Sequence, residues 1–433
     1  MKSRRLSALL LAVCMMAMSL SAQEISEKKD IAVFSLSYAD WSIPSGALGL
    51  VDQAIQNVFV GLGRFNIYGM TYRLEAGDIQ SFIDQVKKYK EENVEIPEEV
   101  RLGEATFTEA DFNKLVGSFI VVIPVMSYYD VRYDEDSYEA DIQTSFTFVN
   151  VEEGKAFASF QIDTSGSGDS QKEAIKGAAD AIPMQLQYEL RSVPEFQLKT
   201  GIIDIIGKEY IIEFGRNMGV QVGDEFAIVE TRVLPSGRQM SKETGLIVVK
   251  SVDEEISSTR VRYSNGRPNV GEQLKEIPRL GVELSGYLDI LQSSDSDEEI
   301  LAIAGLRSVG SRGFYSLRPV VGVEVPLGDS FAIWFPVNAY VGAEANWMFG
   351  RLSINPSAVV GAGFLVPING DEDYEYFSSI GFTGLVEAQY LFKQNMKFFL
   401  RTGYTFYQAL VLEDINPNDY NGLVLGGGLT FKL

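Results

Sequence analysis

Histidine is absent from the sequence, and its 433 residues include a single cysteine, Cys14. Cys14 lies inside an amino-terminal leader pattern, so the mature chain is expected to have neither residue type. This excludes cysteine nucleophiles, serine–histidine pairs, imidazole bases and ordinary zinc sites. A hydrolase built on Asp and Glu pairs is the alternative, but no convergent pair of carboxylates is identifiable. We therefore expect a protein that is not an enzyme, with no catalytic residue, cofactor or metal site.

Basic residues are also scarce, because 37 Lys and Arg stand against 59 Asp and Glu, for a formal net charge of -22. Nucleic acids and anionic lipid surfaces need a basic face, so the composition argues against both as partners. The simplest interpretation of the excess acid is that it keeps the protein soluble. Beyond the leader, no stretch approaches about 18 consecutive apolar residues, so no transmembrane helix is expected.

Residues 1–22 have the pattern of a secretory signal peptide. A basic start is followed by the apolar run Leu6–Leu20 and by the small residues Ser21 and Ala22. The run is too short and wrongly flanked for a spanning helix. The residues before Cys14 match a lipoprotein cleavage box poorly, because the apolar run continues past the cysteine. We expect export by a signal peptide without lipidation.

Strand and helix patterns alternate between residues 23 and 193. Short apolar runs typical of buried strands begin at Asp30 and Phe65, and apolar residues at helical spacing follow each of them. Three further strands and a closing helix over Ser170–Ser192 complete the order. This order predicts a mixed α/β sandwich.

Four stretches of this region, "IAVFSLSY", "GRFNIYG", "SFIVVIPVMSYYDV" and "SFTFVNVEEGKAFAS", resemble a known periplasmic domain. It is shared by the curli secretion protein CsgG, the penicillin-binding-protein activator LpoB and the TolB amino-terminal domain. The family's late hairpin pattern "lxlvnvxtGxv" is matched by Phe148–Val151 with Gly154 and Lys155. The resemblance implies this fold and an envelope location. The insertion Val94–Thr108 departs from the family form, and neither the pore hairpins nor the lipid anchor of CsgG is found.

Short strands and frequent turns between residues 194 and 277 predict a small all-β, barrel-like domain. The motif "GRNMGVQVGDEFAIV" (215–229) places Gly219 and Gly223 at turns that need an unrestricted backbone. It resembles the carboxy-terminal domain of the flagellar assembly protein FlgT. That domain's pattern, "lGxxxGvxxGdxf", is carried here by Gly215, Gly219, Val220, Gly223, Asp224 and Phe226.

Asp224 and Glu225 in this motif could be interpreted as a metal-binding or catalytic pair. Adjacent residues on a strand point to opposite faces, so their carboxylates cannot converge on one ligand. We therefore interpret Asp224 as an acid of a β-turn.

From residue 278 to residue 433, apolar and polar residues alternate along long segments. In Leu280–Ile290 the even positions are apolar or glycine, and the odd positions hold Glu283, Ser285, Tyr287 and Asp289. The final stretch, "GLVLGGGLTFKL", has the same alternation. A soluble barrel and a membrane barrel share this period, with their faces exchanged.

Three features favour the membrane barrel. The strands reach the roughly 9–11 residues needed to cross a bilayer at a tilt. The polar face is dominated by small residues with isolated Arg and Glu, as a narrow lumen requires. Aromatic residues near the strand ends are typical of interfacial girdles. These are Tyr315, Trp334, Phe335, Trp347, Tyr376, Phe377, Phe392, Tyr407, Tyr420 and Phe431.

Seven strands are clear in this region, and termini on one side of the membrane require an even number. The eighth must lie in Glu299–Gly310, where a short helix is the alternative. The predicted outer loops are Ser293–Glu298, Gly328-Asp329, Pro367–Tyr374 and Leu410–Asp419. The predicted periplasmic turns are Gly310–Gly313, Phe349-Gly350 and Gln394-Asn395. An eight-stranded antiparallel transmembrane β-barrel, similar in architecture to the OmpA and OmpX type, has a filled interior and is an anchor, not a diffusion pore.

Acidic runs at Asp134–Asp136, Asp295–Glu299 and Asp371–Asp373 could supply the oxygen ligands that Ca²⁺ takes. None has EF-hand spacing, and solvated loops are the simpler interpretation.

The order of signal peptide (1–22), CsgG/LpoB-like domain (23–193), FlgT-like domain (194–277) and barrel (278–433) predicts a non-enzymatic outer-membrane protein. Its barrel would anchor periplasmic domains that bind envelope proteins or peptidoglycan-associated factors. Its other partners would be the lipid of the outer membrane and the barrel-assembly machinery. An oligomeric secretion or transport component and a surface-exposed adhesin are the alternatives.

Overall fold

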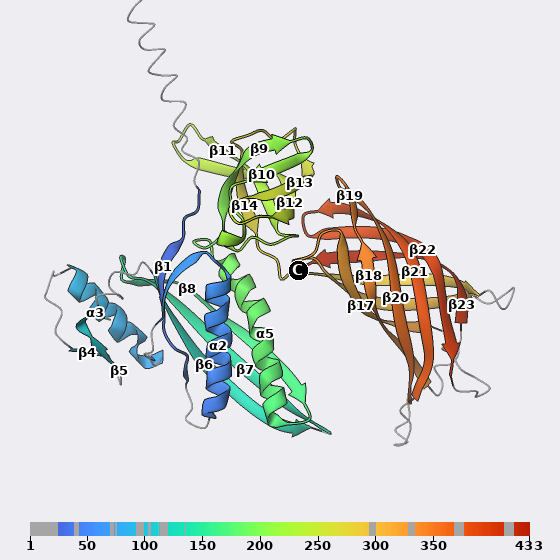
Figure 1. Ribbon diagram of the computed structural model, residues 1–433, viewed down its shortest axis with the longest axis horizontal. Helices are drawn as coiled ribbons and strands as arrows, with labels where there is room; N and C mark the ends of the chain where they lie inside the picture. The colour runs from blue at the N-terminus through green and yellow to red at the C-terminus, as the bar shows by residue number, and fades with distance from the viewer. Residues whose placement is uncertain are drawn as a thin grey trace, which may run out of the picture.

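Three folded units follow one another along the chain (Figure 1). The computed structural model describes residues 25–38, 43–69, 73, 76–91, 99–102, 105–110, 112, 120–134, 136–293, 300–327, 334–367, 376–410 and 420–433. The predicted signal peptide, the acidic runs at 295–299 and 371–373 and most of the predicted outer loops lie outside the described residues.

The amino-terminal unit is built on a mixed sheet of six strands, with the order β3-β1-β6-β7-β8 and β2 paired to β6. β1 runs parallel to β3 and β6, whereas β6, β7 and β8 are antiparallel. The strands are β1 (Lys29–Val33), β2 (Ser37–Tyr38), β3 (Phe65–Gly69), β6 (Ile120–Asp134), β7 (Ser137–Asn150) and β8 (Lys155–Gly168). β4 (Glu99–Leu102) and β5 (Ala105–Thr108) form a separate pair inside the predicted insertion.

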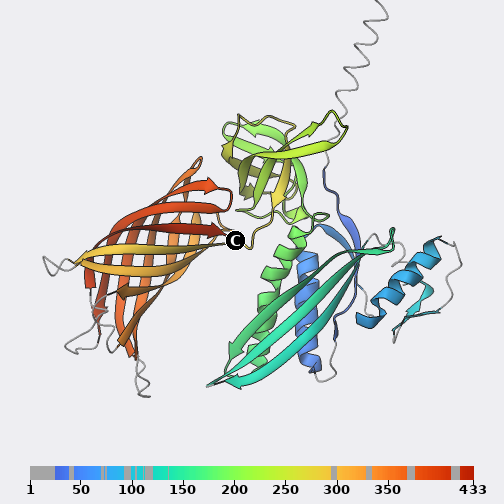
Figure 2. The same ribbon diagram turned by 180° about the vertical axis from the view of Figure 1, so that it is seen from behind.

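Helices α2 (Ser45–Gly61) and α5 (Gln171–Ser192) cover one face of the long strands, as Figure 2 shows from the side of the sheet. Their apolar faces form one buried core with alternate residues of the strands. α3 (Ile79–Glu91) contributes Phe82 to a second core on the other face, where it meets Phe34 edge to face at 5.6 Å. The described part of the whole chain is nonetheless mostly β-strand.

The middle unit is a closed barrel of six strands in the order β10-β13-β12-β11-β14-β9. Its inward residues are apolar, and Phe226, Ile247 and Leu274 are at most 1% exposed. Gly219 and Gly223 adopt φ of 71° and 86°, so the turns expected there are present. The strands are β9 (Lys199–Ile206), β10 (Glu209–Ile212), β11 (Glu225–Val233), β12 (Gln239–Val252), β13 (Ser257–Ser264) and β14 (Gln273–Ile277).

The carboxy-terminal unit is a closed antiparallel barrel of eight strands, in which β18 pairs with β20 and a short strand, β19, extends one edge. The prediction of eight antiparallel strands is confirmed. Residues 300–310 form a strand, so the helix considered for that segment is wrong. The strands are β15 (Val282–Ser293), β16 (Ile300–Gly310), β17 (Leu317–Leu327), β18 (Trp334–Ala345), β19 (Trp347–Phe349), β20 (Leu352–Pro367), β21 (Tyr376–Lys393), β22 (Met396–Ala409) and β23 (Tyr420–Lys432).

The short turns of this barrel lie at the end that faces the middle unit, and the carboxy terminus lies at the same end (Figure 1). The turn after β16 touches the middle unit directly, because the backbone N–H of Gly313 donates to the carbonyl of Val222 at 2.7 Å. The barrel mouth is therefore packed against its neighbours.

Candidate functional site: the barrel interior and the three-domain junction

The two faces of the eight-stranded barrel have opposite chemistry. Along every strand, alternate residues point outward and are large and apolar, including Leu288, Val321, Val360, Leu400 and Leu425. The residues between them point inward, and most of those that are polar are buried. Apolar residues among them, such as Leu291, Ile303 and Val320, form two smaller buried clusters. The buried polar residues include Glu283, Ser285, Asp289, Arg307, Arg318, Glu324, Asn338, Glu344, Ser353, Asn355, Ser379, Thr383, Glu387, Gln389, Lys397, Arg401, Thr405, Thr430 and Lys432.

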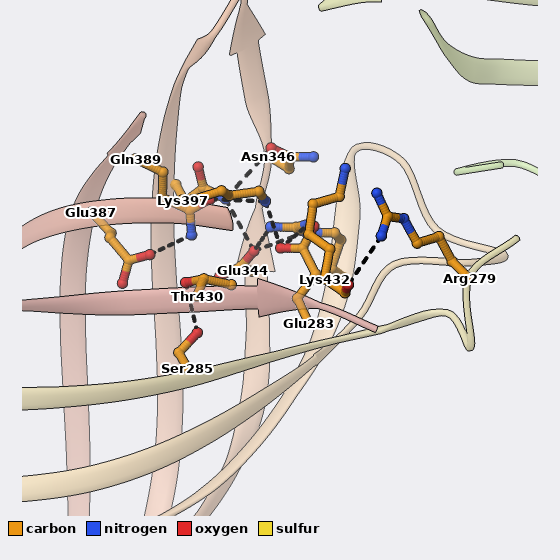
Figure 3. A network of polar contacts seen from close by, with 12 residues as sticks. Arg279, Glu283, Ser285, Glu344, Asn346, Glu387, Gln389, Lys397, Thr430 and Lys432 are labelled. Carbon is orange, nitrogen blue, oxygen red and sulfur yellow. Dashed lines mark hydrogen bonds and ion pairs between the residues drawn. The ribbon is translucent and has the colours of Figure 1, made fainter. Parts of the chain in front are cut away.

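Ion pairs line the end of the barrel nearest the middle unit (Figure 3). The carboxylate of Glu283 accepts a hydrogen bond from Lys397 at 2.6 Å and lies 3.2 Å from Arg318. Arg318 also donates to Glu344 at 2.8 Å. Each charge therefore has opposite charges as neighbours, which low-dielectric burial requires.

The same chain of charges continues deeper into the barrel. Arg307 lies 3.7 Å from Glu344 and donates to Glu387 at 2.8 Å. Gln389 donates to Glu387 as well. The whole chain of pairs connects six different strands, so it fixes the strands relative to one another from the inside.

A second cluster lies beyond this chain of ion pairs. Arg401 donates to both oxygens of Asp289, at 2.9 and 3.1 Å through its Nε, and its guanidinium lies 3.5 Å from the ring centre of Tyr287. Glu324 accepts hydrogen bonds from Tyr287 at 3.1 Å and from Tyr420 at 3.3 Å. Hydroxyl groups and charges alternate here, so the polar atoms are largely paired within the protein.

Large side chains and glycines fill the lumen together. A Cβ added at Gly305 would collide with the ring of Tyr287, and one at Gly381 with the ring of Tyr407. The cavity lined by this cluster measures about 20 Å³, which is space for one or two water molecules at roughly 10–15 Å³ each. This barrel is thus packed and not an open channel, as its strand number predicts.

At the junction of the amino-terminal and middle units, two arginines converge on Glu276 of β14. Arg64, just before β3, donates to both carboxylate oxygens at 2.6 and 2.7 Å, and Arg191 of α5 donates at 2.7 Å. The backbone N–H of Leu198 adds a further hydrogen bond at 3.1 Å. Burial disfavours the charge of Glu276, but Arg64 and Arg191 outweigh it and lower its pKa to about 2.

Asp224 joins all three units. It accepts hydrogen bonds from Arg191 of α5 at 3.0 Å and from Arg312, in the turn after β16, at 2.8 Å. Arg312 also donates to the side-chain oxygen of Gln187 on α5 at 2.7 Å and to the carbonyl of Gly219 at 3.3 Å. One carboxylate of the middle unit therefore holds a cation of each neighbour.

Glu225, the next residue, also binds the barrel. It accepts from Lys432 of β23 and from Arg279 of the connecting segment, the latter at 3.3 Å. Arg279 in turn donates to the carbonyl oxygens of Lys432 at 3.2 Å and Gln394 at 3.1 Å. Lys432 is buried in the barrel mouth, and its carboxylate partner comes from another unit.

Charge at this junction is divided by unit. The middle unit supplies three buried carboxylates, and its neighbours supply the cations that bind them. Buried pairs of this kind contribute little net stability, but removing one partner is costly because it leaves the other charge buried alone. Their main effect is to select one relative arrangement of the three units.

Sequence reasoning missed this role of Asp224 and Glu225. Asp224 precedes β11 and Glu225 begins it, and the two carboxylates bind different cations. The carboxylate of Asp224 also accepts from the backbone N–H of Gln221 at 2.8 Å, as a turn acid would. Their arginine partners lie 33 to 88 residues away in the sequence. No local pattern indicates such pairs.

Three residues assigned to the aromatic girdle were placed wrongly, since Tyr315 lies between the barrel and the middle unit with its hydroxyl buried. Tyr407 is 1% exposed and Tyr420 is 6% exposed, and their rings meet inside the barrel with centres 5.1 Å apart. Trp347, Phe377 and Phe431 do lie on the outer face. The strand-end position of a tyrosine does not reveal which face it occupies, because its hydroxyl suits either a wet interface or a polar lumen.

No group of three or more His, Cys, Asp or Glu side chains is arranged to hold a metal ion within the described ranges. Among the helices that the structure describes, none is both long enough and apolar enough to cross a membrane.

Comparisons with known proteins give distant likenesses. No family model matches the chain, and no curated protein matches it. Among solved structures, Neisserial surface protein A is 14% identical, with 35% of this chain and 96% of that chain covered and a TM-score of 0.27. The lipoprotein GNA1162 from Neisseria meningitidis is 10% identical, with 33% and 85% covered and a TM-score of 0.19. The hypothetical protein CT253 from Chlamydia trachomatis is 13% identical, with 37% and 90% covered and a TM-score of 0.22.

Proposed function

We propose that this protein is a non-enzymatic outer-membrane protein whose barrel anchors two folded domains in the periplasm. The observation that carries the proposal is the apolar outer face of the barrel, where Leu288, Leu400 and Leu425 are 65%, 66% and 65% exposed. A belt of this size is unfavourable in water and is covered by lipid in a bilayer. The chain enters and leaves the barrel at the end that carries the short turns. Both other units therefore lie on one side of the membrane.

Fractionation tests the anchor. The mature protein is expected to stay in the membrane pellet after carbonate extraction and to migrate faster on a gel before heating than after it. A chain released in the soluble periplasmic fraction, without a heat-dependent gel shift, would contradict the proposal. Because the lumen is filled, no conductance steps are expected in planar bilayers, which distinguishes an anchor from a transport component.

We further propose that the amino-terminal unit binds periplasmic envelope proteins or peptidoglycan-associated factors, as its resemblance to the CsgG, LpoB and TolB domain implies. The junction supports this, because Asp224, Glu276 and Arg191 would hold that unit in one orientation relative to the anchor. A rigidly held domain loses less freedom when it binds a partner.

Photo-crosslinking in intact cells tests partner binding. Crosslinkers replace Tyr128 and Tyr133, which are 50% and 62% exposed on β6, and a control crosslinker replaces Val233, 69% exposed on the middle barrel. One envelope protein should be captured at the β6 positions and not at the control. Equal capture at all three positions, or none, would argue against a specific surface on this unit.

A further inference from the structure

One arginine at the barrel mouth is buried without a partner. Arg262 lies on β13 of the middle unit, is 5% exposed, and its Nη1 has no hydrogen-bond partner within the described part of the chain. No carboxylate of the described residues forms an ion pair with it, whereas neighbouring Arg279 and Lys432 share Glu225. A buried guanidinium without an ion pair is unfavourable unless a bound group of opposite charge compensates it.

Arg262 opens onto a cavity between the middle unit and the barrel. The cavity measures about 40 Å³ and is closed on the barrel side by Arg318, Lys397 and Lys432. At roughly 10–15 Å³ for each water-sized atom, it holds about three. The hydroxyl of Tyr315, which also lines it, is likewise buried without a partner.

The lining of this cavity has a surplus of positive charge, in a chain whose net charge is -22. It contains six cationic side chains and three carboxylates, Asp224, Glu225 and Glu283. Each carboxylate is already shared by two cations of the lining or its neighbours. Arg318 also pairs with Glu344 from deeper in the barrel, whereas Arg262 has no ion pair of its own among the described residues and feels Glu225 and Glu283 only from a distance.

We propose that the cavity binds a small inorganic anion, of the size of chloride, between Arg262 and the cations of the barrel mouth. The anion would accept hydrogen bonds from the guanidinium of Arg262 and the hydroxyl of Tyr315. It would also screen Arg262 from the like charge of Arg318. Burial and Arg318 lower the pKa of Arg262, whereas Glu225 and Glu283 raise it.

The size of the cavity defines the ligand class. Drug-sized organic acids and lipid headgroups need a pocket of several hundred Å³, so they do not fit about 40 Å³. Water would fit but would leave the charge of Arg262 uncompensated. The site lies between two units, so the bound anion would also strengthen their contact. This inference depends on the fold and not on the proposed membrane location or partner.

Thermal unfolding of the full-length protein in detergent tests the site. Sodium chloride, sodium phosphate and sodium gluconate are compared at constant ionic strength, so that screening of surface charges is equal. A ligand that binds only the folded state raises the unfolding midpoint with its concentration. Chloride should give a saturable rise that phosphate and gluconate, which are too large for about 40 Å³, do not.

Arg262→Gln keeps the size of the side chain and removes its charge. Its apparent affinity for the anion should fall by about tenfold or more, since a charged hydrogen bond is lost. The control Arg267→Gln makes the same change at an exposed position of the same unit and should retain the full rise. Equal midpoints in all three salts, or an undiminished rise in Arg262→Gln, would overturn the proposal.

Diffraction from wild-type crystals soaked in bromide removes any dependence on how the variant folds. An anomalous peak within hydrogen-bond distance of Arg262 is expected. A cavity without such a peak, at a bromide concentration that saturates the chloride effect, would exclude an anion there.

Discussion

The molecule contains two closed antiparallel barrels with the same alternation of residues and opposite interiors. The six-stranded barrel places Phe226 and Ile247 inside, and the eight-stranded barrel places Glu344 and Arg318 inside. The two-residue alternation along a strand shows only that its two faces differ, and not which face is buried. What surrounds the barrel decides which face carries the apolar residues, and the larger barrel is built for an apolar environment.

The difference has a structural consequence. An apolar interior needs no partners, but a polar interior must pair every buried charge. The larger barrel achieves this with ion pairs that connect non-adjacent strands, such as Arg307 with Glu387. At its mouth the pairing extends into the other units, because Lys432 is bound by Glu225. Ion pairs thereby connect the eight-stranded barrel to the rest of the chain.

Loss of a junction carboxylate is expected to have the largest effect. Glu276→Gln leaves Arg64 and Arg191 buried without their shared charge, which should lower the free energy of unfolding by about 3–5 kcal/mol. Urea unfolding followed by circular dichroism measures this change. The eight-stranded barrel should keep its heat-dependent gel shift, because none of its interior pairs is altered.

The control for this variant is Glu254→Gln, whose side chain is 72% exposed beside Arg216. Its effect should lie within about 0.5 kcal/mol, as for most exposed positions. Equal losses in the two variants would mean that burial does not distinguish the junction from a surface pair.

Acidification should weaken the same junction. The pKa of Glu276 is lowered from 4.5 to about 2 in the folded state, so its contribution is complete above the unfolded value near 4.5. This contribution to the free energy of unfolding is about 3 kcal/mol. It is lost as the pH falls through the pKa of the folded state. The measured quantity is the difference in free energy of unfolding between wild type and Glu276→Gln at pH 6, 4 and 3. A difference that does not shrink toward pH 3 would contradict the assignment.

A charge on the outer face tests the contrast between the barrels most directly. Leu425→Arg, near the middle of β23, should lower the free energy of unfolding in lipid bilayers by about 2–4 kcal/mol, because the arginine would face the membrane centre. The matched change Val233→Arg, at a position 69% exposed on the six-stranded barrel, should be nearly neutral. If both variants behave alike, the two outer faces do not meet different surroundings.

Alternation predicted seven of the strands of the larger barrel and the face that most of their residues occupy. Glu283 and Asp289 point inward and Leu288 points outward, as expected. The strand at 300–310 was ambiguous, because Ile300, Ala302 and Ala304 alternate with residues that are not clearly polar. Its pairing with β15 and β17 decides its conformation, and such neighbours are invisible to a local pattern.

The junction could not be predicted for the same reason. Arg64 and Glu276 are 212 residues apart, and the stretch "GRFNIYG" that contains Arg64 gives no sign of its partner. Gly219 and Gly223 were expected at turns, but a Cβ at Gly219 would also collide with Leu62 of the amino-terminal unit, and one at Gly223 with Ser311 of the barrel. A single sequence reveals the turn but not the surface packed against it.

The smallest expected effect concerns the glycines of the last strand. A Cβ at Gly426 would lie 2.5 Å from the carbonyl oxygen of Leu288 and 2.8 Å from the Cα of Asp289, and would collide with the carboxylate that binds Arg401. Gly426→Ala should therefore destabilise the barrel by about 1–3 kcal/mol through overpacking, seen as a lower temperature for loss of the gel shift.

Gly384→Ala on β21 is the matched change, because a Cβ there meets only the ring of Phe382, at 3.8 Å. Alanine suits a strand better than glycine where space allows, so this variant should be neutral or slightly more stable. A similar loss in both variants would mean that the effect comes from the strand backbone. A loss confined to Gly426→Ala would place it in the crowded polar lumen, the feature that separates this barrel from the apolar one beside it.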